Sequence, residues 1–89
     1  MLTKGQVEPN EVRQTLARVR SAMDDLRAET QRTAAQHERM AAWYTEHGDQ
    51  APAEMERHTA AVQRQLLADL DAGFEALEVA VSAALELDP

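Results

Sequence analysis

The residues that decide the fold read His47-Gly48-Asp49-Gln50-Ala51-Pro52, and they lie between two long helical patterns. No other glycine or proline occurs between residues 10 and 72. Gly48 can adopt the left-handed conformation that ends a helix, and Pro52 fits the first turn of a following helix. A connection this short requires its two helices to lie antiparallel and adjacent. The stretch therefore predicts the turn of a helical hairpin.

Apolar residues on both sides of this turn recur every three or four positions, which places them on one face of an α-helix. In the first half they are Val12, Leu16, Val19, Met23, Leu26, Met40 and Tyr44. In the second half the stripe is Met55, Thr59, Val62, Leu66, Leu70, Phe74, Leu77, Val81 and Ala84. We predict an all-α antiparallel two-helix hairpin, with a helix over 9–46, a turn over 47–52, a helix over 53–87 and a disordered lead-in over 1–8. Because the stripe becomes polar at Thr30, Thr33 and His37, the best packing is expected far from the turn.

The length and composition favour association with other helices. A chain of 89 residues without cysteine forms one small domain that no disulfide can stabilise. Two long helices cannot bury two apolar faces alone, and residues 79–85 are apolar almost all round, which indicates a second contact surface. We therefore expect dimerisation into a four-helix bundle, with this chain itself or a paralogous hairpin as partner. The expected interface places Leu66, Leu70, Phe74, Leu77 and Val81 in the seam, and Leu67, Val79 and Leu85 on the partner surface.

The charge of the chain restricts its partners and its location. Sixteen acidic residues against nine basic ones give a formal charge of −7, and there is no basic tract. Such a chain repels phosphate groups, which argues against nucleic-acid binding and against anionic membrane surfaces. No run of 18 apolar residues could span a bilayer, and the N-terminus lacks the apolar core of a signal peptide. The expected location is cytoplasmic, or outside the cell after export without a cleaved leader.

The hairpin tip holds the candidate binding residues. Trp43 and Tyr44 precede the turn, and exposed aromatic residues of these types often anchor interfaces. The alternative is that both close off the core beside the loop. Glu54 and His58 are four residues apart on one helical face and, with His37, form a candidate metal site. The alternative there is an ordinary charged surface, and no cofactor is predicted.

Nothing in the sequence predicts catalysis. The chain has no cysteine nucleophile, and Ser21 and Ser82 lie within helices without a glycine elbow. A glycine-rich phosphate loop is also missing, and a two-helix rod does not form a water-excluding pocket alone. We therefore expect a protein that is not an enzyme.

A chain of about 90 residues with two antiparallel helices, and with Trp43 followed by Gly48 at the midpoint turn, resembles the WXG100 (ESAT-6-like) family. The resemblance implies a helical hairpin that dimerises into a four-helix bundle. It also implies export by a type VII secretion system without a cleaved leader. Two hypotheses follow from the sequence: a non-catalytic helical interaction protein, or a small regulatory protein that senses a ligand or metal near the tip.

Overall fold

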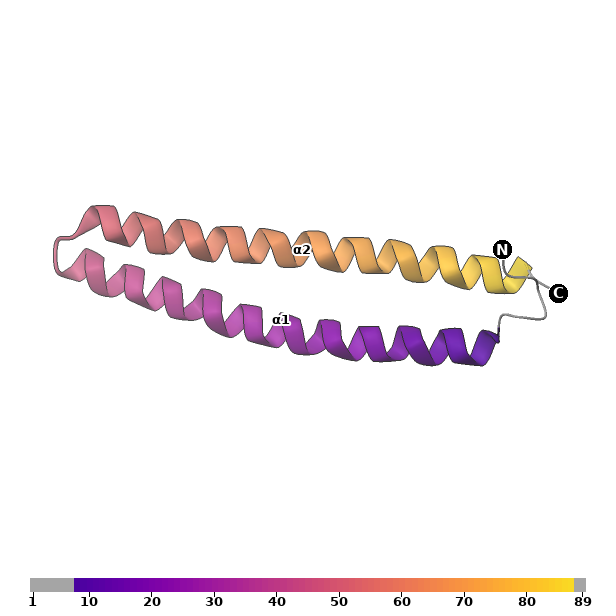
Figure 1. Ribbon diagram of the computed structural model, residues 1–89. Helices are drawn as coiled ribbons and strands as arrows, with labels where there is room; N and C mark the ends of the chain where they lie inside the picture. The colour runs from indigo at the N-terminus through magenta and orange to yellow at the C-terminus, as the bar shows by residue number, and fades with distance from the viewer. Residues whose placement is uncertain (1–7, 88–89) are drawn as a thin grey trace.

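The computed structural model describes residues 8–87, which form two helices joined by a turn (Figure 1). Helix α1 spans Pro9–Glu46 and helix α2 spans Gln50–Leu87, with 38 residues in each. The predicted all-α helical hairpin is confirmed. Helix α2 begins three residues earlier than the expected residue 53, so the turn is shorter. The expected lead-in, residues 1–8, lies outside the described residues except for Glu8, which is extended directly before α1.

The ends of the helices have local causes in the sequence. Pro9 begins α1, where its missing N–H costs nothing, and Glu11 adds negative charge at the positive end of the helix dipole. At the other end Gly48 has φ +82°, a left-handed value that favours glycine. The Gly48 N–H donates to the carbonyl of Thr45 over 3.1 Å, and the Asp49 N–H donates to that of Tyr44 over 2.9 Å. This pair of bonds is the Schellman motif, which ends α1 and reverses the chain.

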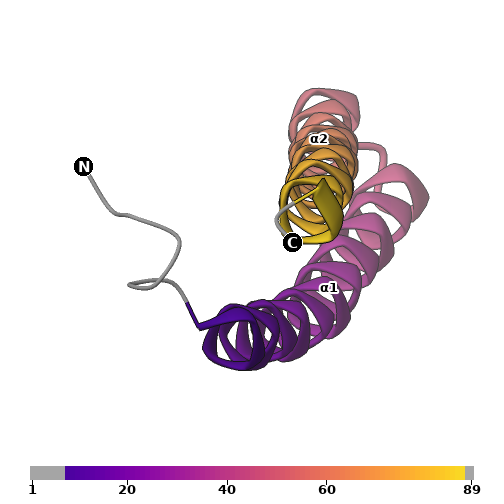
Figure 2. The same ribbon diagram turned by 90° about the vertical axis from the view of Figure 1, so that its right-hand side faces the viewer.

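The hairpin is a rod rather than a compact domain. Its extents are 65 × 19 × 16 Å and its radius of gyration is 19.8 Å, against about 12 Å for a compact chain of this length. Its accessible surface is 6670 Å², whereas a folded monomer of this mass exposes about 5,200 Å². In the end-on view of Figure 2, α1 curves past α2 instead of running straight beside it. The single contact between the two helices therefore leaves much of each helix uncovered.

The seam between the helices is built from side chains spaced seven residues apart. On α2 the buried or half-buried row is Ala53, Ala60, Leu67, Phe74 and Val81. On α1 the half-buried row is Leu16, Met23, Thr30, His37 and Tyr44. A seven-residue repeat keeps one face of each helix toward its neighbour only if the helices wind gently around each other. The hairpin is thus an intramolecular antiparallel coiled coil.

The tightest part of the seam lies near the turn, so the expectation of better packing far from it was wrong. Ala34, Ala41, Ala53 and Ala60 are at most 2% exposed, and all four belong to the half next to the turn. Alanine side chains are small enough to let two helix backbones approach closely. The prediction was based on large apolar residues, so these alanines did not contribute to it. Thr30, Thr33 and His37 do lie along this seam and are half-buried.

The expected division of leucines between seam and partner surface was also wrong. Leu66, Leu70 and Leu77 are 57%, 50% and 52% exposed, so they lie outside the seam. Leu67 is 8% exposed and Leu85 is half-buried, so both contribute to the contact within the hairpin. The physical reason is the alanine row, which turns α2 so that Leu67, rather than its neighbour Leu66, meets α1.

We expect the replacement Gln63→Leu to stabilise the hairpin. The Gln63 side chain lies in the seam, and its Oε1 atom is buried without a hydrogen-bond partner among the described residues. Replacing a buried, unsatisfied amide by an apolar group of similar size should raise the free energy of unfolding by about 1 kcal/mol. Thermal unfolding followed by circular dichroism measures this, with Gln65→Leu on the exposed surface as control. Equal melting temperatures for the two variants would contradict the prediction.

Candidate interaction surface

One flank of the hairpin, which we call the polar flank, is closed by side chains that bond across the seam. Its α2 row is Arg57, Arg64, Asp71 and Glu78, each seven residues after the last. These residues contact, in order, Thr45, Glu38, Arg27 and Arg20 of α1. Charges along the two rows are in complementary order, so a slip by one heptad would bring like charges together. Sequence reasoning missed this ladder, although the seven-residue spacing was visible.

The strongest of these contacts is a two-pronged pair at the middle of the hairpin. The Arg27 Nη2 atom donates to Asp71 Oδ1 over 2.7 Å, and Arg27 Nε donates to Asp71 Oδ2 over 3.2 Å. Arg27 Nη1 also donates to Asp24 Oδ1 over 2.7 Å. The hydrogen bonds to Asp71, and then those to Asp24, raise the pKa of Arg27 above its ordinary value. A planar fork of this kind fixes direction as well as distance, so it sets the helix register.

Reversing one charge of this pair should destabilise the hairpin, and reversing both should restore it. Arg27→Asp places three carboxylates near one another, and Asp71→Arg in the same chain supplies a new partner. We expect the single variant to lower the melting temperature, by less than a change in the buried seam does because the pair is partly exposed. A thermodynamic cycle of the four proteins measures the coupling. Additive effects of the two changes would contradict the prediction.

The other flank of the hairpin, which we call the apolar flank, is exposed and largely uncharged. On α1 it consists of Val19, Leu26, Met40 and Trp43, all at least 40% exposed. On α2 it consists of Met55, Val62, Leu66, Leu70 and Leu77, all exposed to a similar or greater degree. Spacings of three, four and seven residues place each set on one helical face. Scattered exposed leucines are ordinary, but a continuous apolar strip marks a contact surface.

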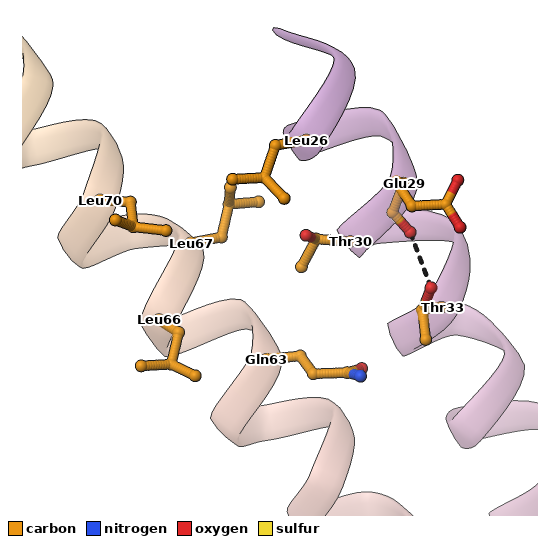
Figure 3. A pocket seen from close by; sticks show the side chains of 8 residues that line it. All are labelled: Leu26, Glu29, Thr30, Thr33, Gln63, Leu66, Leu67 and Leu70. Carbon is orange, nitrogen blue, oxygen red and sulfur yellow. Dashed lines mark hydrogen bonds between the residues drawn. The ribbon is translucent and has the colours of Figure 1, made fainter. Parts of the chain in front are cut away.

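Two grooves show that these flanks lie on opposite sides of the seam. Thr30 and Leu67 line both grooves, because they lie between them. The groove on the apolar flank holds about 250 Å³, and Figure 3 shows its lining: Leu26, Glu29, Thr30 and Thr33 from α1, and Gln63, Leu66, Leu67 and Leu70 from α2. The groove on the polar flank is lined by Arg27, Gln31, Arg64, Ala68 and Asp71 besides the two shared residues. The hairpin therefore has one side bonded to itself and one apolar side.

The tip continues the apolar flank with an exposed aromatic group. The Trp43 side chain is 53% exposed, and its ring stacks on that of His47 with centroids 4.0 Å apart. Tyr44 meets Trp43 edge-on at 5.2 Å and is itself half-buried. Trp43 also lines a hollow with Met40, three residues before it on the same face. Of the two predicted tip residues, the structure thus turns Trp43 outward and Tyr44 partly inward.

The three candidate metal ligands are not brought together. His37 lies in the seam, where its Nδ1 atom contacts a carboxylate oxygen of Glu56 rather than Glu54. Glu54 and His58 are exposed on α2. No cluster of three His, Asp or Glu side chains suited to a metal ion occurs among residues 8–87. Val79, expected on the partner surface, is exposed but lines a hollow with Arg20 and Glu78 beside the polar flank.

Neither helix, within residues 8–87, combines the length and apolar character that crossing a membrane requires. Comparison of the chain with models of protein families, with curated proteins and with solved structures found no match. By its fold and surfaces the protein is a helical hairpin, with ion pairs between its two helices on one flank and exposed apolar residues on the other.

Proposed function

We propose that this protein is a non-catalytic interaction module that buries its apolar flank against another helical hairpin and so completes a helical bundle. One observation carries the proposal: nine large apolar side chains are exposed along a single flank, from Trp43 and Met55 at the tip to Val19 and Leu77 toward the open end. The rod also exposes more surface than a compact monomer of its mass, and the excess is larger than the ~800 Å² that one partner buries in an ordinary interface.

The polar flank supports the same proposal by exclusion. Its arginines and carboxylates already bond to each other within the hairpin, so a partner there would have to replace existing ion pairs. On the apolar flank a partner covers mainly apolar groups, with Glu29 as the charged residue of the groove lining, and each Å² of apolar surface removed from water contributes about 25 cal/mol. A hairpin partner presents two helices and can cover both rows of this flank at once.

Thermal unfolding of the purified chain at several concentrations tests the proposal. A melting temperature that rises with concentration is expected if the partner is the chain itself. If the partner is a different protein, the isolated chain should unfold over a broad, non-cooperative range, because half of its core is missing. A sharp melting transition whose temperature does not change when the protein is diluted about 100-fold would overturn the proposal.

The resemblance to the WXG100 family stays a prediction, as does a regulatory function that senses a ligand or metal. The hairpin outline agrees with that family. However, Trp43 and Gly48 are five residues apart where the family has two, and Tyr44 lies before the turn. A neighbouring gene for a second hairpin or a type VII ATPase would favour export. Elemental analysis of the purified protein, compared with His58→Ala, tests metal binding.

A further inference from the structure

Gly73 is a helical glycine for which the hairpin itself has no use. It lies within α2, where glycine is an unfavourable residue compared with alanine. A Cβ atom added there would meet nothing within 4 Å, so no close contact inside the hairpin requires its absence. Gly73 lies three residues after Leu70 and four before Leu77, on the same helical face as the α2 row of the apolar flank. A glycine on such a row would let the backbone of a neighbouring helix approach closely.

The side chains of the two rows on the apolar flank alternate in size at the same levels. Arg27 pairs with Asp71, and Arg20 pairs with Glu78. Seven residues toward the N-terminus of α1 therefore correspond to seven residues toward the C-terminus of α2. The same register places a large side chain of one helix beside a smaller one of the other at three levels: Thr33 with Leu66, Leu26 with Gly73, and Val19 with Ala80. Alternating large and small side chains lets facing layers interdigitate.

The two helices carry different charges, which restricts how a second hairpin can cover this flank. Helix α1 contains six acidic residues and six arginines, so its formal charge is zero. Helix α2 contains seven acidic residues and two arginines, a formal charge of −5. Two copies stacked in opposite orientations would place α2 on α2 and concentrate negative charge. Two copies in the same orientation place α2 on α1, whose formal charge is zero.

We propose that the occupant of the apolar flank is a second copy of this chain in the same orientation, so that α1 of each copy packs on α2 of the other with Gly73 facing Leu26. This inference rests on the proposed function and names its partner. The two copies are related by a two-fold axis parallel to the helices, so each residue lies at the same height along the bundle in both copies. Each of these three layers then holds two larger and two smaller side chains. All neighbouring helices in the resulting four-helix bundle are antiparallel.

Cross-linking of single-cysteine variants tests the orientation, because the chain has no cysteine of its own. Val19→Cys and Ala80→Cys are prepared separately, mixed and treated with a short bismaleimide. We expect mixed dimers, because the proposed packing brings these two positions of different copies together. Val19→Cys mixed with Thr33→Cys or Met40→Cys should not cross-link, since only opposite orientations bring the open end of one α1 to the turn half of another. Ser21→Cys with Val79→Cys, away from the apolar flank, is the matched control.

The replacement Gly73→Leu tests the close approach. In the single hairpin residue 73 is exposed and a Cβ atom there meets nothing within 4 Å, so helicity by circular dichroism should stay unchanged or increase. The dimer lacks room for the new side chain, so its dissociation constant should rise about 10- to 100-fold. Ala72→Leu, at the next position but off the apolar flank, should leave the dissociation constant unchanged. An unchanged or lowered constant for Gly73→Leu would overturn the proposed packing.

The failure of this inference can be distinguished from failure of the proposed function. Cross-links of Val19→Cys to the turn half of the partner would show dimers of opposite orientation, which overturn the inference and leave the function. A monomer that unfolds non-cooperatively would also overturn the inference, because this result points to a different protein as the partner. A cooperative monomer overturns both.

Discussion

The double variant Leu66→Glu, Leu70→Glu should be a monomer at concentrations where the unchanged chain is a dimer. Both leucines are at least half exposed in the single hairpin, and glutamate has nearly the helix propensity of leucine. The hairpin itself should therefore stay helical. In the bundle, however, each carboxylate would be buried in an apolar layer without a partner. We expect the dissociation constant to rise by more than about 100-fold, since each tenfold corresponds to 1.4 kcal/mol.

The matched control adds the same charge elsewhere on α2. Ala72 and Val79 are exposed residues seven apart and lie away from the apolar flank. Ala72→Glu, Val79→Glu changes the net charge of the chain as much as the first variant does, so general repulsion between copies is equal in both. Sedimentation equilibrium measures the two constants. Equal dissociation of both variants would show that charge alone, rather than the apolar flank, controls association.

The second large effect concerns the seam. Leu67→Ala should lower the free energy of unfolding by about 2–5 kcal/mol, because it removes the only large side chain that is buried between the helices among residues 8–86, and it leaves a cavity. That loss is a large part of the roughly 4–13 kcal/mol that stabilises a domain of this length. A decrease of this size corresponds to at least about 10 °C in melting temperature.

Val79→Ala is the appropriate comparison for Leu67→Ala, since Val79 is 70% exposed on the same helix. Its melting temperature should match that of the unchanged chain within a few degrees. Chemical denaturation of all three proteins provides free energies of unfolding at one temperature. If Leu67→Ala and Val79→Ala unfold at the same denaturant concentration, Leu67 does not hold the helices together.

The turn and the helix ends were predictable because their causes are local. Gly48 permits the left-handed conformation that ends α1, and Pro9 has a fixed φ that suits the first turn of a helix. The seam was harder to predict, because α2 offers two faces that differ by a rotation of one residue. Large apolar residues such as Leu66 and Leu70 mark one face, and the small residues Ala53 and Ala60 mark the other. Hydrophobicity favours the first, whereas close helix contact selects the second.

The excess of apolar residues on α2 was visible in the sequence, but the positions at which they are exposed were not. The exposed large apolar residues lie along the whole apolar flank and are not confined to residues 79–85. Val81 and Leu85 of that segment lie in the seam instead. Arg27 and Asp71 are 44 residues apart in sequence, and their ion pair depends on the register between the two helices, which periodicity within one helix does not specify.

Light scattering of the purified chain at micromolar concentration tests the central claim most directly, because it reports mass independently of the elongated shape. The chain has a mass of 9.9 kDa. A particle of twice that mass, which Leu66→Glu, Leu70→Glu converts to a helical particle of 9.9 kDa, is the result we predict. A cooperatively folded particle of 9.9 kDa for the unchanged chain would contradict the account.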